Sequence, residues 1–176
     1  PAVPTILFMG GSSGARSINQ AVVPILDQLT RAYQVIHLTG LLDWETVAAE
    51  TLNAGERYHA FPYLHEMGAA LAAADLAVSR AGASSLGEYP FFGLPAILVP
   101  YPYAWRYQKV NADYLVEREA AVLLRDEDLQ SRLLATIETL MADPQRLAHM
   151  SRNMRALSQP MAAERIAELL FEMAEA

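Results

Sequence analysis

Residues 5–16 read TILFMGGSSGAR, an apolar run followed at once by a loop of small residues. Such a run, a glycine-rich loop and then a helical pattern are typical of a strand, a tight turn and a helix N-terminus. Small residues let the backbone approach an anion closely. The first N–H groups of the helix have no intrahelical partner and lie at the positive end of its dipole. The stretch therefore predicts an anion site, and we expect the anion to be a diphosphate.

The spacing of this loop matches neither common phosphate-binding fingerprint. The dinucleotide motif is G-x-G-x-x-G, and the P-loop is G-x-x-x-x-G-K-[ST]. An ordinary dinucleotide domain also carries an acidic residue about 20 residues further on, which binds the ribose. The second apolar run here, 35–38, ends in Thr39-Gly40, and the nearest carboxylate, Asp43, comes late. On the loop alone, a tight strand-to-helix turn without a ligand remains an alternative.

The composition is that of an acidic, globular protein. The chain of 176 residues is 53% apolar and 19% charged, which suits one domain with a substantial core. Its net charge of −7 and its 13 scattered Lys and Arg residues disfavour nucleic acid as a partner. The lack of cysteine excludes a disulfide framework and thiolate metal sites. Without a signal peptide or a membrane-spanning run, we expect a cytoplasmic chain.

Short apolar runs alternate with longer helical patterns, which predicts an α/β fold with a doubly wound, mostly parallel, Rossmann-like sheet of about six strands. The expected strands are 5–9, 35–38, 58–61, 76–79, 96–99 and 121–124. The expected helices are 15–32, 43–53, 67–74, 85–92, 107–117, 126–141, 144–157 and 162–174. No strand separates the last three helices, so we expect this C-terminal segment to cover the sheet rather than extend it.

Ligands of such sheets bind beyond the carboxyl ends of the strands, where the strand order reverses. The fourth expected strand ends in a second small-residue loop, 79–88. Glu88 there has two interpretations. Ser85-x-x-Glu88 matches a capping box, in which the carboxylate serves its own helix. Alternatively, the carboxylate accepts both hydroxyls of a ribose, which a glutamine cannot fully reproduce.

The fifth expected strand ends in a third candidate segment, 99–112. Prolines stop the strand, and Gln108 and Asn111 fall three residues apart on one face of the next helix. Amides at such positions can bind sugar hydroxyls. The alternative is an ordinary amphipathic helix start with exposed polar residues.

Together these segments resemble the MurG family of bacterial UDP-N-acetylglucosamine transferases. The resemblance extends nearly end to end and covers the C-terminal domain of that family. It rests on four motifs: Gly-Gly-Ser-x-Gly-Ala-Arg at 10–16, Arg-x-Gly-Ala at 80–83 with Glu88, Gly-Leu-Pro-Ala at 93–96, and Gln-x-x-Asn-Ala at 108–112. Tyr107 departs from the family, which usually has His or Gln before the glutamine.

The resemblance implies a site for UDP-N-acetylglucosamine. The donor diphosphate would meet Gly11, Ser12, Ser13, Gly14 and Arg16. The uridine and ribose would meet Leu64, Met67, Arg80 and Glu88, with backbone groups of Leu64 at the uracil edge. The sugar would meet Ala83, Ser84, Gln108 and Asn111. No metal ligands and no cofactor are expected, since UDP-N-acetylglucosamine is a substrate.

The resemblance also implies one half of a GT-B-type enzyme. Residues 1–4 would be a linker remnant, 5–160 the donor-binding domain, and 161–176 a C-terminal helix that packs toward an N-terminal domain. The reaction would be an inverting transfer of N-acetylglucosamine to the C4 hydroxyl of the lipid-linked muramoyl pentapeptide. No catalytic residue is expected in this domain, because the general base would belong to the N-terminal domain. The isolated chain would therefore be inactive, and the whole enzyme would lie on the cytoplasmic face of the inner membrane.

Two other classes of function remain open. The first is a related sugar-nucleotide enzyme, such as a UDP-N-acetylglucosamine 2-epimerase or a glycolipid synthase. The second is a non-catalytic nucleotide-binding module.

Overall fold

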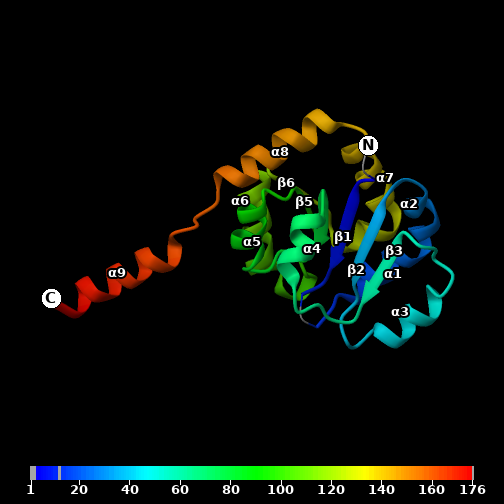
Figure 1. The fold of residues 1–176 in the computed structure, drawn as a ribbon, viewed down its shortest axis with the longest axis horizontal. Helices are drawn as coiled ribbons and strands as arrows, with labels where there is room; N and C mark the ends of the chain where they lie inside the picture. The colour runs from blue at the N-terminus through cyan, green and yellow to red at the C-terminus, as the bar shows by residue number, and fades with distance from the viewer. Residues whose placement is uncertain (1–2, 12, 176) are drawn as a thin grey trace.

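The computed structural model describes residues 3–11 and 13–175. In that part of the chain, six parallel strands form one sheet in the order β3-β2-β1-β4-β5-β6 (Figure 1). The strands are β1 (Thr5–Met9), β2 (Gln34–Leu38), β3 (Tyr58–Phe61), β4 (Leu76–Ser79), β5 (Ala96–Leu98) and β6 (Ala121–Leu123). The doubly wound Rossmann-like sheet is confirmed. Its winding reverses between β1 and β4, so a crevice is expected beyond the carboxyl ends of these two strands.

The helices follow the predicted order, with a few changed boundaries. They are α1 (Arg16–Val22), α2 (Leu26–Ala32), α3 (Trp44–Glu50), α4 (Met67–Ala73), α5 (Ser85–Phe92), α6 (Trp105–Val116), α7 (Leu129–Met141), α8 (Pro144–Ala156) and α9 (Ala162–Glu175). The single helix predicted over 15–32 is wrong. A 3₁₀ turn at Val23–Ile25 separates α1 from α2, because Pro24 has no N–H with which to continue the first helix.

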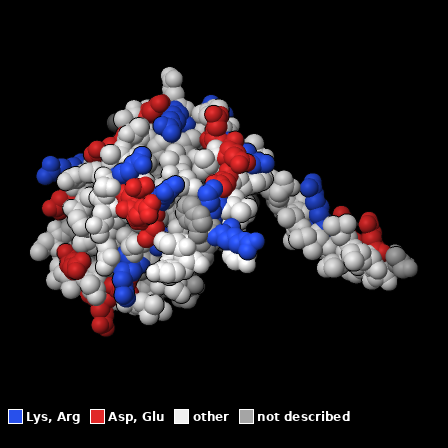
Figure 2. Space-filling view, turned by 180° about the vertical axis from the view of Figure 1, so that it is seen from behind, with Lys and Arg blue, Asp and Glu red and all other residues white. Residues whose placement is uncertain are grey.

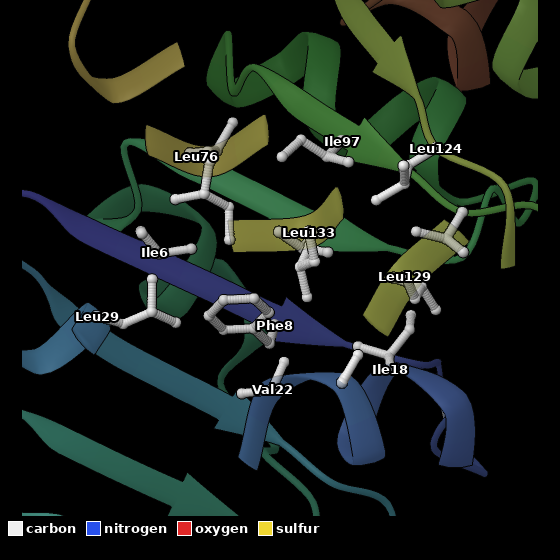
Figure 3. Close-up of a cluster of buried hydrophobic side chains, with 14 of the residues drawn as sticks. Ile6, Phe8, Ile18, Val22, Leu29, Leu76, Ile97, Leu124, Leu129 and Leu133 are labelled. Atoms are coloured by element: carbon white, nitrogen blue, oxygen red, sulfur yellow. The ribbon is translucent and has the colours of Figure 1, made fainter. Parts of the chain in front are cut away.

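The alternation of side chains along β1 divides the core into two layers. Ile6 and Phe8 lie on one face, where they pack with residues of α1, α2 and α7 (Figure 3). Leu7 lies on the other face and belongs to a cluster with residues of α4, α5, α6 and α8. Side chains that alternate between two covered faces explain why the central strands β1, β4 and β5 are mostly apolar. The sheet is thus packed on both faces.

The expectation that the C-terminal segment covers the sheet is confirmed for α7 and α8, which pack on the core, and is wrong for α9. Figure 1 shows that α9 extends away from the body of the molecule. Every side chain described from 161 to 174 is exposed. The apolar ones are 54–76% exposed: Met161, Ile166, Leu169, Leu170, Phe171 and Met173. Its amphipathic pattern was therefore sufficient to predict a helix, but it did not reveal what the apolar face contacts.

Removing residues 161–176 should leave the stability of the remaining protein unchanged. No described side chain in this segment is buried, so its removal exposes no core surface. We expect the melting temperature to change by less than about 1 °C. Self-association should decrease, because exposed apolar faces promote it. Circular dichroism and sedimentation velocity on the two proteins measure both effects. A loss of several degrees would show that α9 packs on the domain in solution.

Candidate functional site

The loop after β1 packs backbone to backbone against the loop after β2. Gly14 has φ of +79° and Gly40 has φ of +80°, a region that favours glycine. A Cβ on Gly14 would lie 2.2 Å from the carbonyl oxygen of Thr39, and one on Gly40 would lie 2.4 Å from the Cα of Gly14. Neither position has room for a side chain. This contact fixes the glycine-rich loop at the carboxyl edge of the sheet.

Two pockets lie on either side of this loop. The first, which we call the α5-side pocket, has a volume of about 200 Å³. It is lined by Met9, Gly11, Leu38, Pro62, Tyr63, Leu64, Met67, Ser84 and Glu88. The second, the α6-side pocket, has a volume of about 630 Å³. Among its lining residues are Gly10, Ser13, Gly14, Arg16, Ser17, Asp43, Arg80, Tyr101, Tyr103, Gln108 and Asp126. The same loop thus contributes Gly11 to one pocket and Ser13 and Gly14 to the other.

The structure brings most of the expected site residues together, with some differences of grouping. Leu64, Met67 and Glu88, expected around a uridine, share the α5-side pocket with Gly11. Arg80 was grouped with them but lines the α6-side pocket instead. Two residues expected at the sugar also separate, since Ser84 lines the α5-side pocket and Gln108 the α6-side pocket. Neither of these two pockets includes Ala83 or Asn111 among its lining residues. Ser12 lies outside the described residues.

The capping-box interpretation of Glu88 is wrong. The N-cap of α5 is Ser84, which makes no side-chain capping bond. The N–H of Ser85 donates to the carbonyl of Gly82 instead, 3.1 Å away. Within the described part of the chain, the Glu88 carboxylate accepts no hydrogen bond. It is half-buried, and burial raises the pKa of its carboxyl. A partly desolvated carboxylate without a partner is suited to accept hydrogen bonds from a ligand.

Unpaired backbone groups accompany Glu88. Among the described residues, the N–H groups of Ala83 and Ser84 have no hydrogen-bond partner, nor do the N–H and C=O of Leu64. All three residues precede helices α4 or α5 at the carboxyl edge. Polar backbone groups that lack a protein partner are available to water or to a ligand.

Arg80 is held by a closed set of hydrogen bonds. Its Nη1 donates to Oδ1 of Asp126 over 2.5 Å, and its Nη2 donates to Oγ of Ser17 over 2.7 Å. The Ser17 hydroxyl in turn donates to the same Oδ1 over 2.6 Å. Nη1 also donates to the carbonyl of Val99, and the guanidinium lies 5.1 Å from the ring centroid of Tyr101. These contacts leave the Arg80 side chain only 10% exposed.

A second ion pair, Arg16–Asp43, lies in the same pocket and is connected to a buried histidine. Arg16 donates to Oδ1 of Asp43 over 2.9 Å, and Asn19 Nδ2 donates to the other oxygen over 3.0 Å. Asp43, the late carboxylate of the sequence, is therefore already bonded to α1. Asn19 Oδ1 contacts His37 Nε2, and His37 Nδ1 contacts the Tyr58 hydroxyl, each over 2.9 Å.

The partners of Asn19 assign the tautomer of His37. The amide nitrogen of Asn19 faces two acceptors, the Thr39 carbonyl and Asp43. Its oxygen therefore faces His37, so Nε2 carries the proton and donates, while Nδ1 accepts from Tyr58. His37 is fully buried, and this burial lowers its pKa to about 4. The ring is neutral at physiological pH, as a locally bonded core histidine.

Gln108 and Asn111 of α6 each make a hydrogen bond to the backbone of a neighbouring loop. Gln108 Oε1 accepts from the N–H of Tyr101 over 2.8 Å, and Asn111 Nδ2 donates to the carbonyl of Ala81 over 3.0 Å. The Gln108 side chain retains its amide N–H donors on the α6-side pocket. Asn111 instead acts on the loop that precedes α5. Tyr107, which directly precedes Gln108, is 76% exposed.

The sequence did not reveal several residues of the α6-side pocket. Ser17 and Asp126 belong to none of the motifs, and Asp126 is only the first residue of the predicted helix 126–141. Within residues 3–11 and 13–175, no group of three or more His, Asp or Glu side chains is arranged to hold a metal ion. In the same ranges, no helix has the length and apolar character to cross a bilayer.

Comparisons with known proteins identify the family of the chain. The model of the glycosyltransferase family 28 C-terminal domain matches residues 5–168. A UDP-N-acetylglucosamine–N-acetylmuramyl-(pentapeptide) pyrophosphoryl-undecaprenol N-acetylglucosamine transferase from Roseiflexus is 42% identical over 96% of the chain and 44% of its own length. The Bacillus subtilis protein of the same name is 37% identical over 96% of the chain and 48% of its own length.

A solved structure is also similar. The crystal structure of Acinetobacter baumannii MurG superimposes with a TM-score of 0.85 and 28% identity, over 97% of this chain and 52% of that one. The chain spans about half the length of the curated relatives that it matches.

Proposed function

Because this chain belongs to glycosyltransferase family 28, as its C-terminal domain, we propose that it is the half of a GT-B-type enzyme that binds UDP-N-acetylglucosamine. The observation that carries the proposal is the arrangement around one loop. On one side lies Glu88, a half-buried carboxylate that has no partner among the described residues, and on the other lies a larger pocket whose lining includes two arginines and Gln108. A nucleoside joined to a sugar by a diphosphate would extend from one pocket, over the loop, to the other.

In this proposal the nucleoside occupies the α5-side pocket. Glu88 accepts hydrogen bonds from both ribose hydroxyls, and the free backbone groups of Leu64 pair with the uracil edge. The diphosphate lies across the loop 11–14, Ser12 included, and Arg16 and Arg80 supply positive charge. The sugar lies toward Gln108 in the α6-side pocket, where the remaining amide donors face its hydroxyls. The N–H groups of Ala83 and Ser84, which have no partner in the described part of the chain, lie on the loop before α5.

We further propose that the whole protein transfers N-acetylglucosamine to the C4 hydroxyl of the lipid-linked muramoyl pentapeptide with inversion. The departing UDP accumulates negative charge, and N–H groups of the loop and the first turn of α1 can stabilise it. Each well-aimed donor contributes about 3 kcal/mol in comparable oxyanion sites. The general base would come from a second domain, so this chain alone should not catalyse transfer.

The domain organisation follows from the same proposal. Residues 1–4 would be a linker, 5–160 the donor domain, and 161–176 a helix whose exposed apolar residues pack on the second domain. The lipid acceptor would then be a partner of the whole enzyme, peripheral on the cytoplasmic face of the inner membrane. Nucleic acid is not a proposed partner. Acidic and basic side chains are interspersed on the face in Figure 2, which supports this.

Ligand titrations followed by ¹H–¹⁵N NMR test the donor assignment. We expect UDP-N-acetylglucosamine and UDP to bind, with weaker binding of UDP-glucose and UDP-galactose and none of NADH. Adding EDTA should leave the affinity for UDP-N-acetylglucosamine unchanged, because no protein-bound metal or cofactor is proposed. A preference for NADH would contradict the assignment. Lipid acceptor turnover by the complete protein separates a transferase from an epimerase or a non-catalytic module.

Replacing Glu88 with glutamine should weaken UDP binding by about 10- to 100-fold, since a hydrogen bond to a charged group contributes about 1.5–3 kcal/mol. The substitution should not lower the free energy of unfolding. Burial raises the pKa of Glu88 above its unfolded value, so the ionised carboxylate disfavours folding at neutral pH. The variant should therefore be at least as stable as wild type at pH 7. Calorimetric titration and denaturant unfolding measure the two effects.

The exposed Glu45→Gln substitution in α3 is the matched control, and it should change neither quantity. Wild-type affinity should also fall as the pH drops through the raised pKa of Glu88, because protonation removes an acceptor. Glu88→Gln should lack this pH dependence. Normal UDP binding by Glu88→Gln would exclude the ribose role.

A further inference from the structure

We propose that Asp126 is a positioning residue for the donor diphosphate. It would act through Arg80 and Ser17, by fixing both at the α6-side pocket, without contacting the ligand itself. The inference rests on the proposed function, because it presumes that the diphosphate binds beside Arg80. Nothing in the sequence motifs singles out Asp126.

The geometry that carries this proposal is a closed triangle of side chains. Oδ1 of Asp126 accepts from Arg80 Nη1 and from the Ser17 hydroxyl, over 2.5 and 2.6 Å. Arg80 Nη2 donates to the same hydroxyl over 2.7 Å. Because each member contacts the other two, none can rotate without breaking two hydrogen bonds.

The triangle joins parts of the sheet that are distant in the sequence. Asp126 and Ser17 are 109 residues apart, and Arg80 and Ser17 are 63 apart. Arg80 directly follows β4, Ser17 lies in the first turn of α1, and Asp126 comes after β6. Arg80 also bonds the carbonyl of Val99, just after β5. One carboxylate therefore connects the anion loop and its helix to the other half of the sheet, across the crevice.

The hydrogen bonds of Arg80 leave donors for a ligand. A guanidinium has five N–H donors, and Asp126, Ser17 and Val99 use three of them in the described structure. Nε and one N–H of Nη2 are left. Asp126 thus fixes the planar fork in one orientation at the wall of the α6-side pocket, and a fixed guanidinium lowers the ordering cost of binding an anion.

Electrostatics and positioning predict opposite signs for the loss of this carboxylate. Asp126 carries a negative charge in the pocket where an anion would bind, so removing the charge alone should tighten UDP binding. If Asp126 holds Arg80 and Ser17 in place, removing it should weaken UDP binding. The direction of the change therefore separates the two effects.

Asp126→Asn is the main test variant, with UDP and uridine as probes in NMR titrations. We expect the Kd for UDP to rise about tenfold and the Kd for uridine to change less than about twofold. A merely structural role would not weaken the diphosphate ligand selectively. Ser17→Ala alters no charge and should also raise the Kd for UDP. This variant replaces Asp126→Asn in the test if Asp126→Asn fails to fold. Glu127→Gln is the charge control, because Glu127 is adjacent and 73% exposed.

The outcomes are distinguishable. Weaker UDP binding by Asp126→Asn, with Glu127→Gln equal to or tighter than wild type, supports the positioning role. UDP binding by Asp126→Asn as tight as that of Glu127→Gln overturns this role and leaves the proposed function intact. Equal losses for UDP and uridine would also overturn it. If wild type binds no UDP at all, the proposed function and this inference both fail.

Discussion

Gly14→Ala should be the most damaging substitution in the site, with a loss of about 2–5 kcal/mol in the free energy of unfolding. About 1–2 kcal/mol comes from a Cβ in left-handed backbone, since φ at this position is +79°. A further ~1–3 kcal/mol comes from overpacking, because the new Cβ would lie 2.2 Å from the carbonyl oxygen of Thr39. The loops after β1 and β2 must then separate.

The same displacement should affect binding. Ser13 and the first turn of α1 would move with Gly14, so UDP affinity should fall at least about tenfold. Denaturant unfolding and NMR titration measure the two losses.

Gly55→Ala provides the matched control. Its φ is +80°, but a Cβ there would have nothing within 4 Å. It should lose only the backbone contribution of about 1–2 kcal/mol and keep wild-type UDP affinity. The difference between the two variants isolates the close approach of the loops. Equal losses of stability in Gly14→Ala and Gly55→Ala would mean that this contact is unimportant.

His37 should make the fold sensitive to acid. Its pKa is lowered to about 4 by burial, so the folded protein keeps the ring neutral while the unfolded chain protonates it near pH 6.5. Below pH 6.5 the unfolded state binds one more proton, so stability decreases by about 1.4 kcal/mol per pH unit. By pH 4 the loss from this one residue reaches about 3 kcal/mol. A protonated Nδ1 could also no longer accept the hydrogen bond that the Tyr58 hydroxyl donates.

Unfolding in urea between pH 7 and pH 4 tests this prediction. His37→Gln cannot titrate, although its amide can still donate to Asn19 and accept from Tyr58. Between pH 7 and pH 4, the loss in free energy of unfolding should be about 3 kcal/mol smaller for His37→Gln than for wild type, whatever the stability of the variant at pH 7. His59→Gln changes an exposed histidine of β3 and should keep the acid-dependent loss. An unchanged loss in His37→Gln would contradict the assignment of a buried neutral ring.

The strands were predictable because their signal is local. The bounds of β1, β3 and β4 agree with those inferred from the short runs. For β1 and β4 the signal is strong because strands covered on both faces are mostly apolar. The break at Pro24 was also available in the sequence, but the helical pattern on both sides of the proline concealed it. The start of α5 shows the limit of local motifs. Both Ser84 and Ser85 could have capped the helix, and only the backbone of residues 82–85 selects Ser84.

The composition of the site was partly predictable, and its internal contacts were not. Gly11 follows β1, Leu64 and Met67 follow β3, and Glu88 follows β4, and the strand order brings them to one pocket. Arg80 stood in a motif, but its partners Ser17 and Asp126 lie 63 and 46 residues away. A single sequence contains no pattern that pairs such distant residues.

The sequence by itself determined the order of the strands and the glycine-rich loop, and it predicted the chemical class of the ligand, because apolar periodicity and small residues act over a few neighbouring positions. Only the tertiary structure decided which side chains remain free for that ligand. Glu88 has no protein partner in the described structure, whereas Asp43 and Asp126 are each bonded to an arginine. All three are carboxylates after a strand or near a helix start, so their different roles depend on contacts that form only when the sheet assembles.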